Sequence, residues 1–221
     1  MKNIILLFTL TFCLSTYAQV DTDQLSLDIS KADAANTEQL KAFIWKKYSV
    51  VTMDGEVKLN TTTEFSFDDK GELQTEMIES KSTEKQKGGI RGRIQKNTMD
   101  ENIDYTQKAL ELAIEYTFMS KGQLLDFFDK AAITENGGII EASGKDVFVK
   151  GDSLNVTVES STKLFLSKTF SSFLDKDPVS GSIEYKKFSS GISHGSKSTL
   201  NLPAKNAVIN SENKDYSQRV E

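Results

Sequence analysis

Cysteine and histidine are almost absent from this sequence, which has one of each in 221 residues. Cys13 lies in an apolar N-terminal segment, and His194 lies in the C-terminal part. A lone histidine excludes histidine-based zinc sites, and loss of Cys13 with that segment would also exclude disulfides and thiolate chemistry. A basic excess is lacking too, since the formal charge is −5. Nucleic acid is therefore excluded as a general partner, because such binders carry a basic footprint.

The N-terminus has the three parts of a secretory signal peptide in the right order. Lys2 supplies a positive charge, an apolar run of 11 residues covers 4–14, and small residues Thr16 and Ala18 precede the expected cut. We expect residues 1–18 to be removed after Ala18, which leaves one domain over residues 19–221. That domain would be exported to the periplasm or secreted.

This segment has two alternative interpretations. A buried N-terminal helix is one alternative, and a lipid anchor on Cys13 is another. The anchor is disfavoured because Phe12, rather than a small residue, precedes the cysteine. No later apolar run approaches the roughly eighteen residues of a membrane span, so we expect no transmembrane segment.

The clearest strand covers residues 56–67, where apolar and polar residues alternate. This alternation predicts one buried and one wet face, with the odd positions from Val57 to Phe67 buried. Asp54-Gly55 predicts a hairpin to a preceding strand over 45–52, because both central residues of such a turn need positive φ. Leu73, Thr75 and Met77 continue the same buried face after a turn.

Helices are predicted at three places. Leu40, Phe43 and Ile44 fall at helical spacing and indicate a helix over 31–45. Residues 80–97 are glycine-rich and read as a loop, and two helices follow it. Their starts are marked by capping-box pairs, Thr98 with Glu101 and Ser120 with Gln123.

From Gly137 onward the pattern is again that of strands separated by turn residues. The expected strands cover 138–142, 146–150, 153–159, 163–174, 179–188 and 197–209. Closely spaced strands imply one large antiparallel sheet. The fold class is therefore α+β, with an N-terminal helix and an inserted helical pair packed on one face of the sheet.

This order of elements, over about residues 38–216, resembles the LolA-like superfamily of periplasmic lipoprotein carriers. Local stretches such as Val158–Leu164, Leu174–Val179 and the tail from Pro203 also resemble exported bacterial proteins. The resemblance implies an open half-barrel whose mouth is covered by helices. It implies no site residue, because no ligand-handling motif can be matched position by position.

Motifs that could support catalysis or metal binding have simpler explanations. Gly191-Ile192-Ser193-His194-Gly195 matches G-x-S-x-G, but no histidine follows it and a strand, not a helix, is expected next. We interpret it as a polar turn between edge strands. Asp68–Gly71 and Asp175–Asp177 lack the spacing of a calcium loop, and turn formation explains their acids. We expect no enzyme activity, no metal and no cofactor.

Two surfaces remain as candidate binding sites. Segment 81–96 carries six basic residues and one acid, so Arg91 and Arg93 are candidate contacts for an anion or an acidic headgroup, although a solvated loop is the alternative. Aromatic and aliphatic residues on the predicted faces either fill a core or line an apolar cavity. The candidate lining residues are Val57, Leu59, Phe65, Phe67, Leu124, Phe127 and Phe128.

The sequence thus favours a non-enzymatic exported carrier that holds a lipid or an acylated protein between sheet and helices. The alternative is a secreted structural or protein-interaction module with a filled core. Cavity volume separates the two.

Overall fold

The computed structural model describes residues 22–83 and 89–219, with side chains in the second range at residue 101 and from 103 onward. The predicted signal peptide and Cys13 lie outside these residues. The helices are α1 (Thr22–Leu40), α2 (Gly89–Thr117) and α3 (Lys121–Lys130), with a short 3-10 helix η1 (Pro203–Lys205). The strands are β1 (Phe43–Met53), β2 (Glu56–Phe67), β3 (Leu73–Ser82), β4 (Ala132–Asn136), β5 (Ile139–Lys145), β6 (Ser153–Glu159), β7 (Phe165–Leu174), β8 (Asp177–Lys187), β9 (Ser193–Leu202) and β10 (Ala207–Gln218).

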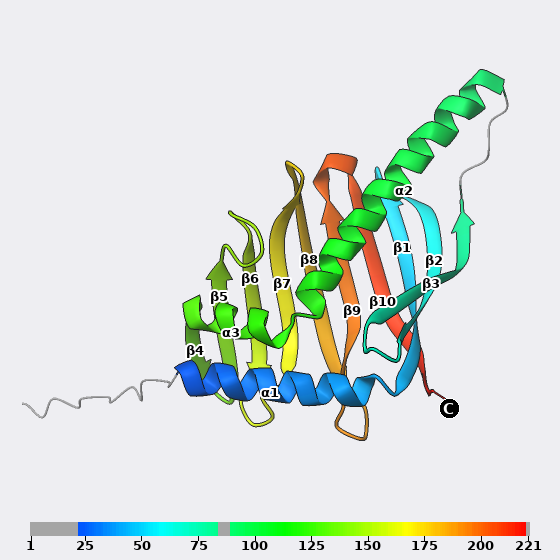
Figure 1. Ribbon diagram of the computed structural model, residues 1–221. Coiled ribbons are helices and arrows are strands. Elements are labelled where there is room, and N and C mark those ends of the chain that lie inside the picture. The colour runs from blue at the N-terminus through cyan, green and yellow to red at the C-terminus, as the bar shows by residue number, and fades with distance from the viewer. Residues whose placement is uncertain (1–21, 84–88, 220–221) are drawn as a thin grey trace, which may run out of the picture.

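All ten strands form one open antiparallel sheet in the order β3-β2-β1-β10-β9-β8-β7-β6-β5-β4. Every neighbouring pair is consecutive in the chain except β1 and β10, so two meanders join where the first and last strands pair. The three helices lie over one face of the sheet (Figure 1). This arrangement confirms the predicted α+β class and the position of the helical pair.

Helix α1 begins and ends earlier than the predicted 31–45. Its buried side chains include Leu25 and Ile29, four residues apart, whereas Trp45 already belongs to β1. The prediction was wrong because Phe43 and Ile44, which follow Leu40 at helical spacing, already belong to β1.

Helix α2 begins at Gly89, so the expected loop over 80–97 and the expected start at Thr98 are both wrong. The glycines of this segment suggest a loop, but the arginine, glutamine and lysine residues that follow Gly89 are good helix formers. The start of α3 is as predicted. Ser120 accepts from the backbone N–H of Gln123 at 3.3 Å, and Gln123 accepts from that of Ser120 at 2.7 Å.

Three strand predictions need correction. Segment 146–150 forms a loop, because the buried carboxylate of Asp152 accepts hydrogen bonds from the backbone N–H groups of Val147, Phe148 and Val149. Segment 197–209 contains the end of β9, the 3-10 helix and the start of β10. Strand β4 was not predicted.

The core has two clusters of buried residues. The larger one surrounds α3 and includes Phe127 and Phe128, whereas the smaller one contains Leu40, Trp45, Phe65 and Phe67. The phenylalanines of β2 and α3 therefore do not meet, so the candidate lining residues named from the sequence do not share one cavity. Met77, expected to be buried, is 61% exposed because β3 is an edge strand.

Candidate ligand cavity

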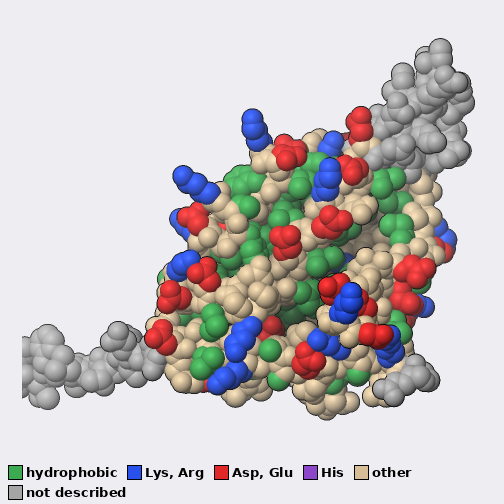
Figure 2. All heavy atoms as spheres, viewed as in Figure 1, with side chains coloured by type: hydrophobic (Ala, Val, Ile, Leu, Met, Phe, Trp, Pro, Cys, Tyr) green, Lys and Arg blue, Asp and Glu red, His purple; other side chains and the backbone are tan. Residues whose placement is uncertain are grey.

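A cavity of about 450 Å³ lies between α2 and the end of the sheet formed by β1, β2, β3 and β10. Figure 2 shows hydrophobic side chains within a hollow of this helix-covered face. The helical wall comes from Ile103, Thr106, Gln107, Leu110, Glu111 and Ile114. The sheet wall comes from Lys47, Ser49, Val51, Met53, Lys58, Leu59, Thr61, Thr63, Phe65, Thr75, Met77, Ser82 and Ile209.

Three rows of side chains cross the sheet beneath this cavity, each with one residue from β10, one from β1 and one from β2. Their β1 and β2 members all line the cavity. In order along β1, starting nearest Met53, the rows are Ile209–Val51–Leu59, Ser211–Ser49–Thr61 and Asn213–Lys47–Thr63.

The first row is apolar and the other two are polar, so the cavity is amphipathic along its length. The hydroxyl groups of Ser49 and Ser211 satisfy one another at 2.8 Å. Lys47 has no such partner: it makes no hydrogen bond or ion pair within the described residues, and its nearest ring contact is with Phe65, 5.9 Å from Nζ to the centroid. Loss of hydration lowers the pKa of Lys47 to about 8.

An aromatic cluster packs against the sheet beside Lys47, at the end of the cavity. Trp45 stacks on Phe65 at 5.5 Å and on Tyr216 at 5.7 Å between ring centroids. A second cavity of about 40 Å³ lies beside these rings, and Lys47, Phe65 and Ile114 line both cavities. Lys47 therefore stands at the inner end of the larger cavity.

The C-terminal end of α2 is fixed to the sheet by two buried polar contacts. The Tyr116 hydroxyl donates to Asp152 at 2.5 Å, and Lys168 Nζ donates to the carbonyl oxygen of Thr117 at 2.9 Å. From there α2 crosses the sheet obliquely and extends past the ends of β1 and β2 (Figure 1). The cavity thus lies beneath the part of α2 from Ile103 to Ile114, just before the anchored end of the helix.

The structure places the predicted lining residues in three different environments. Leu59 and Phe65 line the cavity, whereas Phe67 packs in the smaller cluster. Val57 is 44% exposed and faces away from the cavity, because a β-bulge between the Val51–Leu59 and Thr52–Val57 pairs reverses the alternation. The α3 residues Leu124, Phe127 and Phe128 are buried in the larger cluster.

Sequence reasoning missed Lys47, Ser49 and the α2 side of the cavity. The alternation of Trp45, Lys47, Ser49 and Val51 along β1 carried a usable signal, since it places a lysine among inward positions. The side chains of Arg91 and Arg93 lie outside those that the structure describes, so their proposed anion contact stays a prediction.

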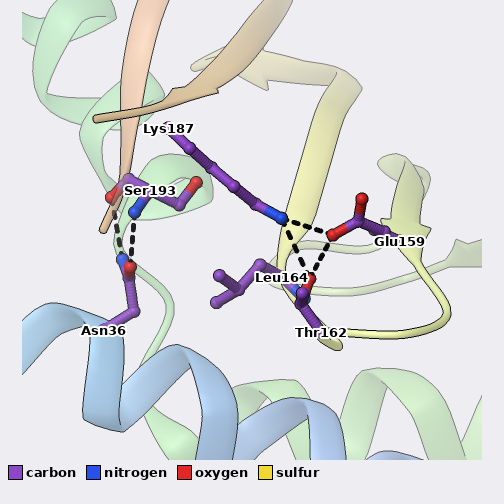
Figure 3. A network of polar contacts seen from close by, with 6 residues as sticks. All are labelled: Asn36, Glu159, Thr162, Leu164, Lys187 and Ser193. Atoms are coloured by element: carbon purple, nitrogen blue, oxygen red, sulfur yellow. Dashed lines mark hydrogen bonds and ion pairs between the residues drawn. The ribbon is translucent and has the colours of Figure 1, made fainter. Parts of the chain in front are cut away.

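The G-x-S-x-G match lies in a hairpin and at the start of β9, which is an interior strand rather than the expected edge strand. Ser193 is buried, and its backbone N–H and carbonyl oxygen bond to the Asn36 side chain at 2.6 and 2.8 Å (Figure 3). The His194 ring stacks on Phe188 at 4.2 Å. The serine therefore anchors α1 to the sheet, and the strand-turn-helix geometry of a nucleophile elbow is replaced by a β-hairpin.

A second network in Figure 3 holds neighbouring turns together. Lys187 pairs with Glu159, which also accepts a hydrogen bond from Thr162 at 2.5 Å. These contacts join the β6–β7 turn to β8, so they stabilise the sheet rather than form a site.

The acidic turn residue Asp68 stabilises its own turn through hydrogen bonds to the backbone. The Asp68 carboxylate accepts from the backbone N–H groups of Lys70 and Glu72 at 2.9 and 2.8 Å. Within the described part of the chain, no three potential metal-binding side chains of histidine, cysteine or acid type gather in one place. Among the helices of residues 22–83 and 89–219, none has the length and apolar character needed to cross a bilayer.

Comparisons with known proteins find similarity at the level of structure. No protein-family model and no curated protein matches the sequence. A DUF1329 family protein from Desulfovibrio piger is 11% identical with a TM-score of 0.42, over 90% of this chain and 94% of that one. A putative outer membrane lipoprotein-sorting protein domain from Vibrio parahaemolyticus is 9% identical with a TM-score of 0.42, over 88% and 92%.

A LolA superfamily protein from Nitrosomonas europaea is 9% identical with a TM-score of 0.35, over 86% of this chain and 94% of that one. The superfamily that the order of elements resembles is therefore among the structural neighbours. Identities and TM-scores at this level assign no function, which has to come from the cavity.

Proposed function

We propose that this protein is an exported, non-enzymatic carrier that binds an apolar or amphiphilic ligand, such as a lipid or the acyl chain of a protein, between α2 and the sheet. The observation that carries the proposal is the cavity of about 450 Å³ lined by Val51, Leu59, Leu110 and Ile114. Its volume falls within the roughly 300–1,000 Å³ of ligand pockets. Apolar walls with a few polar groups are also typical of such sites.

A structural module with a filled core is the competing function, and one region of the molecule favours it. The sheet under α3 is packed without comparable space, with Phe128, Ile140 and Leu154 fully buried. The competing function would require the cavity beneath α2 to be closed in solution. Ligand binding there would exclude it.

Titration of the protein lacking residues 1–18 with the neutral fluorophore N-phenyl-1-naphthylamine tests the proposal. Leu59→Trp places an indole in the cavity, whereas Val57→Trp places it on the opposite face of the same strand. We expect the first variant to weaken probe binding at least about tenfold, a loss of about 1.4 kcal/mol, and the second to leave it unchanged. Absence of binding to the unsubstituted protein, or equal loss in both variants, would refute the carrier function.

Export has its own test. Cleavage after Ala18 would give a mature chain that begins at Gln19, and the intact mass of the protein recovered from outside the cytoplasm measures this directly. A mass that includes a lipid-modified Cys13 would show instead that the protein is anchored to a membrane.

A further inference from the structure

Two lysines point inward from the sheet, and they have opposite surroundings. Lys168 is 1% exposed, and in this case Nζ has two partners, since it donates to the Thr117 carbonyl oxygen at 2.9 Å and lies 4.1 Å from the centroid of the Phe165 ring. The nearby carboxylate of Asp33 adds electrostatic attraction. Lys168 therefore has a structural role at the C-terminus of α2, where the helix dipole favours a cation.

Lys47 occupies the equivalent inward direction on β1 but lacks these partners. No carboxylate, carbonyl or hydroxyl group in the described residues bonds to its ammonium group, and the carbonyl oxygen of the Asn213 side chain, directly opposite on β10, is buried without a hydrogen bond. A partly desolvated cation without a counter-charge is costly, so such groups are normally paired. The ammonium group of Lys47, at the inner end of the larger cavity, is thus left for an anionic ligand group, whereas the Asn213 oxygen lines only the smaller cavity and can accept only from a donor.

The other charged groups around the cavity do not offset Lys47. Lys58 is paired with Glu56 at 2.8 Å, and Glu111 is exposed on α2, where it accepts from Gln107 at 3.2 Å. Lys197, near the smaller cavity, lies opposite Glu212 in the sheet register. The inner end of the cavity therefore carries one uncompensated positive charge, and its outer end is walled by Val51, Leu59 and other apolar side chains.

Building on the proposed carrier function, we infer that the ligand is a single-chain amphiphile with an anionic headgroup, bound with its head at Lys47 and its chain along Val51, Leu59 and Leu110. A carboxylate or a phosphate monoester meets this requirement equally. Charge complementarity at the closed end and apolar walls at the open end select this class over neutral or cationic amphiphiles.

The experiment displaces bound N-phenyl-1-naphthylamine with four ligands of equal chain length: dodecanoate, dodecyl phosphate, dodecanol and dodecylamine. We expect both anions to displace the probe at concentrations at least about tenfold lower than dodecanol, and dodecylamine to be the weakest. A preference for dodecanoate over dodecyl phosphate would assign the headgroup to a fatty acid, and the reverse preference would assign it to a phosphate ester.

Three variants locate the selectivity. Lys47→Met removes the charge at similar side-chain length, so it should abolish the preference for anions without weakening the binding of dodecanol. Lys47→Arg keeps the charge and should therefore keep the preference for anions. Lys46→Met is the matched control, because this neighbouring lysine lies on the opposite face of β1 and outside the cavity. Lys46→Met should leave the displacement of the probe by all four ligands unchanged.

The outcomes separate this inference from the function on which it rests. Equal displacement by dodecanoate and dodecanol, or an anion preference that survives in Lys47→Met, would overturn the headgroup assignment and leave the carrier function intact. Failure of the neutral probe itself to bind would overturn the carrier function.

Discussion

The two ends of the sheet solve the same packing problem in different ways. Under α3, the inward residues of β5 and β6 are apolar and fully covered, and Ile140 and Leu154 have no exposed surface. Under the middle of α2, the corresponding positions of β1 and β2 hold Lys47, Ser49 and other polar or short side chains, and a cavity remains. One sheet therefore combines a filled half with an open half.

Glycines also differ between the two halves of the sheet, because in the filled half they leave room for phenylalanine rings. A Cβ atom added at Gly144 would lie 2.8 Å from Cε2 of Phe127, and one at Gly181 would lie 2.5 Å from Cε1 of Phe170. In the open half, short hydroxyl side chains such as Thr61 and Thr63 face α2 with no aromatic side chain of α2 among the cavity-lining residues of the described chain. The cavity therefore coincides with the part of the sheet where short hydroxyl side chains, instead of rings packed against glycine, face the helix.

The largest effect should come from cutting one large side chain from the filled half. Phe128→Ala is expected to lower the free energy of unfolding by about 3–5 kcal/mol, because Phe128 is fully buried and its removal leaves a void. Leu110→Ala, at the wall of the existing cavity, should cost less than about 2 kcal/mol. Urea denaturation of both variants measures the difference, and equal losses would mean that the two halves are packed alike.

A second effect should appear on raising the pH. Burial lowers the pKa of Lys168 to about 8, so between about pH 8 and pH 10 the unfolded chain binds more protons than the folded one. Stability should therefore rise across this window, on the order of 2 kcal/mol for this lysine. Above pH 10 the raised pKa values of Tyr116, Tyr185 and Tyr216 oppose the rise, because the unfolded tyrosines ionise first.

Lys168→Met should remove most of this pH dependence, and Lys47→Met a smaller part, since Lys47 is the more exposed of the two. Denaturation curves at about pH 8 and about pH 10 supply the slopes. If the slope of Lys168→Met matched that of the unsubstituted protein, Lys168 would not be buried as described.

A third comparison concerns single methyl groups. Gly181→Ala should cost about 1–3 kcal/mol, because the new methyl group meets the Phe170 ring and lies 3.2 Å from the Thr199 carbonyl oxygen. Gly195→Ala should be neutral or slightly stabilising, since its nearest contacts are ordinary ones at 3.6 Å and the unfolded chain loses freedom. Thermal denaturation of the pair is sufficient, and comparable losses would remove the evidence for tight ring packing.

Much of the fold followed from local sequence patterns. The strand over 56–67, the Asp54-Gly55 turn and the Ser120–Gln123 capping box each depend on a few residues, and each was placed correctly, although Val57 breaks the predicted alternation. The start of α2 was missed because its glycines oppose a helix that only the longer segment supports. The Asp152 loop was missed because a single buried carboxylate, not a periodic pattern, determines it.

The site was less accessible to prediction than the fold. Leu59 and Phe65 were placed at the cavity, but the bulge that turns Val57 outward depends on the pairing of β1 with β2, which alternation within one strand does not reveal. Pairing of the first and last strands brings Ile209 to the same wall. Contacts of such long sequence separation need the complete topology.

The most direct measurement is a crystal structure of the protein, lacking residues 1–18, bound to dodecanoate that carries bromine on its terminal carbon. The account predicts an anomalous bromine peak beside Val51, Leu59 and Leu110, with the carboxylate at Lys47. A bromine peak beneath α3 or at Lys47 itself would contradict it, as would a structure in which side chains of α2 fill the cavity and no ligand is bound.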